Sequence, residues 1–149
     1  MNIRPDHKSF DHWSDRFVGT PYLEFGRSLE GCDCWGLAYT IYREELQISL
    51  PEYLGHGSVR EHAEIAELVA GATSSPLWVP VSGAAVAFDV SVFRRGRFDT
   101  HVGIVVHHGL MIHISESDCA KVESYRTGVW SHRHTGTYRH VEMLSKVSR

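Results

Sequence analysis

Cys34 is the residue whose type and position point most directly to chemistry. It lies in the run GCDCWG at residues 31–36, where a turn gives way to residues that favour a helix. A thiol at the N-terminus of a helix experiences the positive end of the helix dipole, which favours the thiolate. Because the thiolate is the nucleophilic form, this position predicts a cysteine that can attack a carbonyl carbon.

Two downstream histidines, His101 and His113, could supply the base that such a nucleophile needs. Between residues 100 and 115, aliphatic side chains alternate with other residues on both sides of a turn, which predicts a β-hairpin. A two-residue loop would place the two histidines on opposite faces. A three-residue loop at 107–109, with Gly109 in the left-handed conformation, is a favoured type. It also gathers the aliphatic side chains on one face, so the hydrophobic pattern favours the three-residue loop.

In that register His101 and His113 are diagonal neighbours on the other face, roughly 7–8 Å apart at the backbone. Gly103 lies opposite His113 and leaves room for the two imidazoles to meet. One imidazole could take the thiol proton while the other fixes its tautomer and orientation. We assign His101, at the start of the strand, as the base and His113 as the orienting residue. The alternative is a pair of partly buried histidines that bond to backbone carbonyls and have no catalytic role.

Periodicity and capping signals predict the elements that position these residues. We expect a helix at 9–18, a second helix from Cys34 that is capped by Asp33, and a third at 58–70. Strands are predicted at 78–81, 84–88, 90–93, 121–126 and 137–142, with a hairpin tip or a loop at 94–97. Helices followed by strands indicate an α+β fold, a single domain over residues 1–149 with N-terminal helices packed on an antiparallel β-sheet.

The composition excludes several classes of function. The 149-residue chain has a formal net charge of −3 and no run of lysine or arginine, so we expect no nucleic-acid partner. Its apolar stretches are far shorter than the roughly 20 residues that a membrane span needs, so we expect no membrane insertion. The segment 1–8 is polar, so we also expect no signal peptide and synthesis in the cytoplasm.

Zinc binding is an alternative use for the three cysteines and eleven histidines. Structural zinc sites usually show ligand pairs at Cys-x2–4-Cys or His-x3–5-His spacing. The pairs in this chain are tighter than that, and one of them falls in the predicted turn. We therefore expect no metal and no other cofactor. The candidate ligands weighed are Cys32, Cys34, His107, His108, His132 and His134.

These motifs resemble those of the NlpC-type papain-like cell-wall endopeptidases. The shared features are an Asp-Cys-x-Gly junction at 33–36, a His-Val-Gly-Ile strand at 101–104, and His113 twelve positions after the first histidine. A Pro-Tyr pair ends at Tyr22, twelve residues before Cys34, where the family places a tyrosine. The resemblance extends from about residue 17 to residue 138.

The resemblance implies a cysteine peptidase that hydrolyses γ-D-glutamyl amide bonds in peptidoglycan stem peptides. It implies a triad in which Cys34 is the nucleophile, His101 the base and His113 the orienting residue. Tyr22 would stabilise the oxyanion together with the backbone N–H of Cys34. Asp33 and Trp35 would lie in the substrate site, where most members have serine at the position of Trp35. An indole cannot accept a hydrogen bond from a substrate amine as that serine does.

The run at 31–36, the Leu-Pro pair at 50–51 and the closing TYRH at 137–140 look like the branch found in phage tails and gene-transfer-agent particles. That branch implies a virion component at a tail tip or baseplate, which opens the cell wall on the periplasmic side during DNA delivery. Two alternatives stay open. One is a non-catalytic structural or assembly protein of the tail, and the other is a thiol amidase or acyltransferase of related fold.

Overall fold

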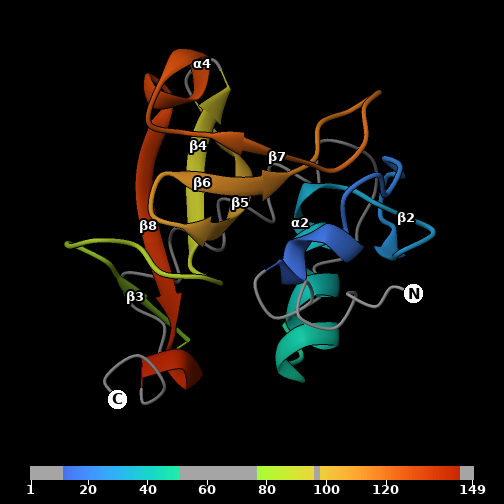
Figure 1. Ribbon diagram of the computed structural model, residues 1–149, viewed down its shortest axis with the longest axis horizontal. Coiled ribbons are helices and arrows are strands. Elements are labelled where there is room, and N and C mark those ends of the chain that lie inside the picture. The colour runs from blue at the N-terminus through green and yellow to red at the C-terminus, as the bar shows by residue number, and fades with distance from the viewer. Residues whose placement is uncertain (1–11, 51–76, 96–97, 145–149) are drawn as a thin grey trace, which may run out of the picture.

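The computed structural model describes residues 12–50, 77–95 and 98–144, and the predicted helix at 58–70 lies outside these ranges. Figure 1 shows the sheet on one side of the molecule and helix α2 (Cys34–Ile41) on the other. The described residues form a six-stranded antiparallel sheet in the order β3-β8-β4-β5-β6-β7. Its strands are β3 (Trp78–Pro80), β4 (Val90–Arg95), β5 (Phe98–His107), β6 (Leu110–His113), β7 (Lys121–Ser124) and β8 (His134–His140).

The remaining elements of the described ranges are short. A two-stranded ribbon of β1 (Arg27–Ser28) and β2 (Gly31–Cys32) leads directly into α2. The others are single turns: η1 (Trp13–Arg16), η2 (Tyr42–Leu46), α4 (Gly128–Ser131) and η3 (Val141–Met143).

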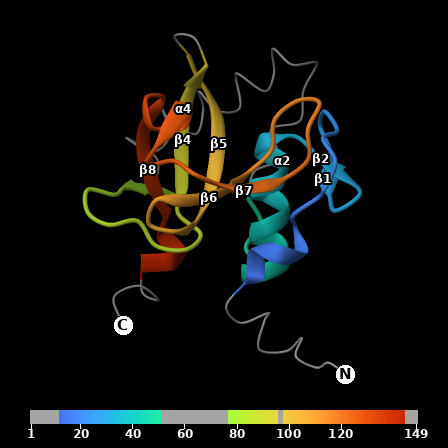
Figure 2. The same ribbon diagram turned by 45° about the horizontal axis from the view of Figure 1, so that its top comes forward.

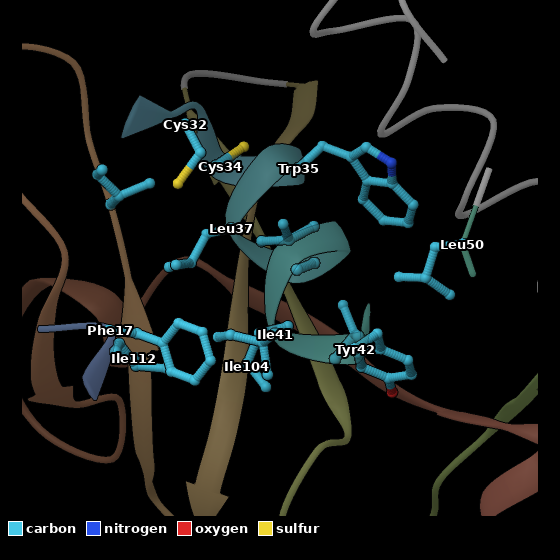
Figure 3. Close-up of a cluster of buried hydrophobic side chains, with 14 of the residues drawn as sticks. Phe17, Cys32, Cys34, Trp35, Leu37, Ile41, Tyr42, Leu50, Ile104 and Ile112 are labelled. Carbon is cyan, nitrogen blue, oxygen red and sulfur yellow. The ribbon is translucent and has the colours of Figure 1, made fainter. Parts of the chain in front are cut away.

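Helix α2 packs against β5, and the two elements run alongside each other in Figure 2. The packing buries the aliphatic face of the β5–β6 hairpin against the apolar stripe of α2, as the alternation predicts (Figure 3). This main core includes Phe17, Leu37, Ala38, Ile41, Val102, Ile104, Ile112 and Ile114.

A second apolar cluster lies on the opposite face of the hairpin. Val105 and Met111 alternate with the residues of the main core, so their side chains point to the other side of the sheet. They pack there with Phe93 and Tyr125, and Trp130 covers them in part. His101 and His113 also alternate with the main core, so this second face is the one that carries the two histidines.

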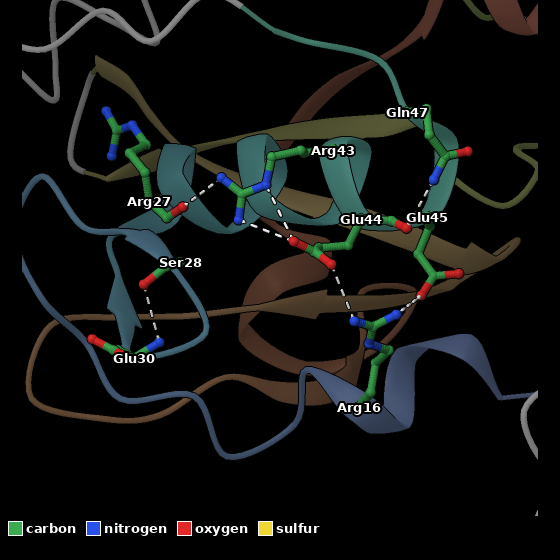
Figure 4. A network of polar contacts seen from close by, with 8 residues as sticks. All are labelled: Arg16, Arg27, Ser28, Glu30, Arg43, Glu44, Glu45 and Gln47. Carbon is green, nitrogen blue, oxygen red and sulfur yellow. Dashed lines mark hydrogen bonds and ion pairs between the residues drawn. The ribbon is translucent and has the colours of Figure 1, made fainter.

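The first two predicted helices differ from the observed ones. Of the helix expected at 9–18, the described part is the single 3-10 turn η1, whose preceding residue, His12, provides no side-chain cap. The second helix begins at Cys34 as predicted, but after Ile41 it widens into the π-helical turn η2. In this turn the carboxylate of Glu45 lies 3.2 Å from the guanidinium of Arg16 (Figure 4).

The prediction of a strand at 84–88 is wrong, because the segment is irregular and ends in a turn at 87–88. Asp89 accepts a hydrogen bond from the backbone N–H of Val86 at 2.9 Å, and Phe88 has a positive φ of 76°. The Asp89 carboxylate is buried and also binds Arg139 through both oxygens, at 2.8 and 2.9 Å. A local side-chain bond and a long-range ion pair therefore override the apolar run that suggested a strand.

The loop of the β5–β6 hairpin also differs from the prediction. Ile104 pairs with Ile112 and Val105 with Met111, which is the expected register. The pairing then shifts, so that His107 faces Leu110 and the turn narrows to His108 and Gly109. Val106 is left as the extra residue of a bulge, which absorbs the shift without moving the body of the hairpin.

We expect Ile104→Ala to lower the free energy of unfolding by about 2–5 kcal/mol, because it leaves a cavity between β5 and α2. The exposed Val122, on β7, is the matched control. Val122→Ala is expected to cost less than about 1 kcal/mol. Chemical denaturation of the two variants measures both values, and equal losses would show that Ile104 is not part of a tightly packed core.

Candidate active site

The carboxylate of Asp33 fixes the head of α2. It accepts hydrogen bonds from the backbone N–H of Gly36 at 2.7 Å and of Phe25 at 2.9 Å. The first bond is the predicted helix cap, and the second ties the cap to the loop before β1. Cys34 is the first residue of the helix and its side chain is buried, with 3% exposed. The predicted placement of Cys34 at a capped helix N-terminus is therefore confirmed.

Arg27 pairs with this buried carboxylate. Its Nη1 lies 2.8 Å from Oδ1 of Asp33, and it also donates to the backbone carbonyl of Gly26. Both side chains are withdrawn from water, with 10% of Arg27 and 0% of Asp33 exposed. A buried carboxylate that lost such a partner would be an uncompensated charge next to Cys34. The sequence did not indicate Arg27, since no local pattern links it to Asp33.

Gly36 explains why the junction ends in glycine. A Cβ at this position would lie 2.0 Å from the carbonyl oxygen of Gly26 and 2.8 Å from Nη1 of Arg27. The helix and the preceding loop approach so closely that a side chain would separate them. The glycine thus permits the contact that brings Arg27 to Asp33.

Trp35 and Asp33 are both fully buried, with 0% exposed. Trp35 is part of the main core, and Asp33 already accepts three hydrogen bonds from the protein. The structure therefore gives these two residues supporting positions beneath the site. Their burial argues against the substrate contacts that were expected of them.

Tyr22 lies in the segment beside Cys32. Its backbone N–H donates to the carbonyl of Asp118, and it bridges to Cys32 in a parallel arrangement. The backbone N–H of Cys32 in turn donates to the carbonyl of Pro21 at 3.1 Å. These bonds hold the half-buried Tyr22 next to the strand that leads into Cys34. Its expected part in binding the oxyanion stays a prediction.

The three cysteines, all in the described ranges, form no disulfide and differ in environment. Cys32 is completely buried, and burial together with the adjacent Asp33 carboxylate raises the pKa of its thiol to about 12. Cys32 is therefore a thiol at neutral pH. Cys119 is exposed.

His101 and His113 meet as the hairpin register predicts. Nε2 of His101 lies 2.9 Å from Nδ1 of His113, and the rings are nearly perpendicular at 82°. Both imidazoles are buried, with 0% and 1% exposed. The space over Gly103 is filled by Met111, since a Cβ at Gly103 would lie 2.4 Å from its sulfur. The contact between the two rings is confirmed, and Met111 is the neighbour that the sequence did not indicate.

Glu123 is a third member of this group that sequence analysis missed. Its Oε1 lies 2.7 Å from Nε2 of His113. Glu123 stands on β7, where it pairs with Met111 and is diagonal to His113. The connection at 114–120 is irregular, so no turn rule predicted this register.

Trp130, from α4, covers the two imidazoles. Its ring is stacked on His101 at a centroid distance of 4.7 Å and 21°, and it meets His113 edge-on at 5.1 Å. Trp130 is half-buried, and the guanidinium of Arg133 lies 5.7 Å from its ring. Trp130 therefore forms the outer wall of the histidine pair.

Within the described ranges, no group of three or more His, Cys, Asp or Glu side chains is arranged to hold a metal ion. None of the helices that the structure describes is long and apolar enough to span a membrane.

Two curated proteins with similar sequences have names that describe a murein peptidase and a γ-glutamyl hydrolase. The chain is 24% identical over 138 residues to the murein DD-endopeptidase MepS/murein LD-carboxypeptidase of Escherichia coli K12, covering 93% of this chain and 64% of that protein. It is 28% identical over 128 residues to the γ-DL-glutamyl hydrolase of Bacillus subtilis, covering 85% of this chain but 27% of that protein. The chain thus spans less than two thirds of either relative.

Solved structures share the fold. The NlpC/p60 domain of the peptidoglycan hydrolase SagA superposes with a TM-score of 0.58 at 18% identity, over 92% of this chain and 99% of that one. An NlpC/P60 family protein of Bacillus cereus gives a TM-score of 0.61 at 22% identity, over 93% of this chain and 40% of that one. The predicted α+β, papain-like fold is confirmed. The model of the NlpC/P60 family matches residues 19–139, and the chain belongs to this family.

Proposed function

We propose that this chain is a cysteine peptidase that cleaves amide bonds in peptidoglycan stem peptides. The observation that carries the proposal is the buried contact between His101 on β5 and His113 on β6, whose ring nitrogens lie 2.9 Å apart, with α2 packed against β5. A nucleophile at the head of that helix and an oriented imidazole form the usual pair for acyl transfer. The family and the murein endopeptidase among the relatives support peptidoglycan as the substrate class.

In this proposal His101 is the general base and then the general acid. Its Nε2 is engaged by His113, so Nδ1 is the atom that takes the proton from the sulfur of Cys34. The thiolate attacks the scissile carbonyl carbon and forms a C–S bond. The imidazolium then gives its proton to the leaving amine as the C–N bond breaks, and water hydrolyses the resulting thioester.

The developing oxyanion is proposed to bind the backbone N–H of Cys34 at the start of α2 and the hydroxyl of Tyr22. The positive end of the helix dipole favours negative charge at the first of these positions. The backbone bonds of the Tyr22 segment to Cys32 support the second, since they hold that tyrosine beside the helix entrance. Asp33 and Arg27 then act on this site by fixing the head of the helix.

We further propose that the bond cleaved is of the γ-D-glutamyl type. The similarity to a γ-DL-glutamyl hydrolase supports this bond. The proposed setting is the tail tip of a phage-like particle, where the enzyme opens the cell wall during DNA delivery. The run GCDCWG and the closing TYRH support that setting.

We expect Cys34→Ala to remove the hydrolytic activity and His101→Ala to lower it by roughly 10²–10⁴-fold, the usual contribution of a general base. His113→Ala should cost less, because solvent can replace part of an orienting contact. Loss of turbidity of a peptidoglycan suspension measures the activity, and mass spectrometry of the released muropeptides identifies the bond. The exposed His132 provides the control variant His132→Ala.

Three outcomes would contradict the proposal. Full activity of Cys34→Ala would show that Cys34 is not the nucleophile, and no activity above background in either the unchanged protein or this variant would leave a non-catalytic tail protein as the better interpretation. Products cut at a bond outside the stem peptide would instead favour an amidase of related fold.

Alkylation rates test the nucleophile without any substrate. Near neutral pH we expect iodoacetamide to modify Cys34 faster than Cys119 and Cys32. Cys119 controls for access because it is exposed, while Cys32 controls for burial and has a thiol pKa of about 12. Only an activated sulfur at a buried position should react faster than an exposed one. Equal labelling of Cys34 and Cys119, read by peptide mass spectrometry, would speak against activation.

A further inference from the structure

The histidine pair is part of a longer chain of hydrogen bonds that ends on Glu123. Oε1 of Glu123 lies 2.7 Å from Nε2 of His113, and Nδ1 of His113 lies 2.9 Å from Nε2 of His101. Both ring nitrogens of His113 therefore have partners. His113 is buried while the side chain of Glu123 is 41% exposed, so the chain runs from the surface to the base.

The carboxylate of Glu123 determines the direction in which the protons of this hydrogen-bond chain are donated. An ionised carboxylate can only accept hydrogen bonds, so Nε2 of His113 must carry a proton. A neutral His113 then has a lone pair at Nδ1, which accepts the proton on Nε2 of His101. A neutral His101 in turn keeps its lone pair at Nδ1. Each link determines the tautomer of the next ring.

The opposite direction would disable the base. If His113 carried its proton at Nδ1, it would donate to Nε2 of His101. A neutral His101 would then carry its own proton at Nδ1 and could accept none there. The two arrangements have the same heavy-atom positions, so packing alone does not distinguish between them. The carboxylate of Glu123 distinguishes between them, because it requires a proton on Nε2 of His113.

We propose that Glu123 is a positioning residue, which holds His113 and His101 in the tautomers that leave Nδ1 of His101 ready to accept a proton. The use of that proton acceptor by Cys34 rests on the proposed function. The tautomers themselves depend only on the observed contacts.

Neighbouring charges do not take over this role. Asp118 and Lys121 form an exposed ion pair at 3.1 Å. The backbone N–H of Cys119 and the Lys121 ammonium lower the pKa of Asp118, and the Asp118 partner raises the pKa of Lys121. Asp118 also interacts with His113 through space, but its two carboxylate oxygens bond the backbone N–H of Cys119 and the ammonium of Lys121. Glu123 is the carboxylate in hydrogen-bond contact with His113.

Nitrogen NMR of histidine reads the tautomers directly. The protein carries Cys34→Ala, so that no turnover or thiol ionisation interferes, and it is labelled with ¹⁵N-histidine at about pH 8, above the ordinary imidazole pKa of about 6.5. We expect Nε2 to be protonated in both His101 and His113. Adding Glu123→Ala should produce a mixture in which part of His113 is protonated at Nδ1. The exposed Glu116 gives the control Glu116→Gln, which should leave the spectrum unchanged.

Kinetics of the enzyme with Cys34 intact provide a second readout. Glu123→Ala should lower kcat by about 10–100-fold, the size of effect found when a hydrogen-bond partner that orients a metal-binding histidine is removed, with little change in KM. Glu123→Gln keeps an acceptor oxygen and should recover part of the loss. Unchanged histidine tautomers in Glu123→Ala would overturn this inference and leave the proposed peptidase untouched. Activity in Cys34→Ala would overturn the peptidase while the tautomer result stands.

Discussion

The rest of the site depends on the hydrogen bonds that the buried carboxylate of Asp33 accepts. It joins the first turn of α2, the loop that contains Phe25 and the guanidinium of Arg27. Helix capping alone would leave a negative charge beside the candidate nucleophile, where it would oppose a thiolate. The arginine compensates this charge, and Gly36 provides the close approach that makes the pairing possible. Position and electrostatics at Cys34 thus have a common origin.

The second constraint is the pleat of the β5–β6 hairpin. The side chains of Val102, Ile104 and Ile112 on one face of the hairpin pack into the main core. A slip of one residue would expose these side chains and would also separate the histidines. The free energy of core packing therefore maintains the His101–His113 contact, although neither imidazole belongs to that core. The bulge at the turn shows that the loop adapts to the register.

The features that could be predicted from the sequence are those whose determining interactions are local or periodic. The cap at Asp33, the start of α2 and the histidine register follow from capping chemistry and alternation. The segment 84–88 was mistaken for a strand because its conformation depends on Asp89, whose partner Arg139 is fifty residues away. Glu123 and Trp130 were missed as site residues because irregular segments separate them from the histidines they contact. Arg27 was missed because its ion pair with Asp33 depends on the close approach of α2 at Gly36, which no local pattern indicates.

The stacking of Trp130 on His101 has an energetic consequence for the proposed proton transfer. An indole face attracts a cation within about 6 Å of its centroid, and the attraction grows as water is excluded. The imidazole of His101 lies at 4.7 Å and is fully buried. The attraction is stronger when that ring has gained a proton than when it is neutral. If Cys34 transfers its proton to His101 as proposed, the tryptophan would favour the imidazolium and thiolate over the uncharged imidazole and thiol from which they form.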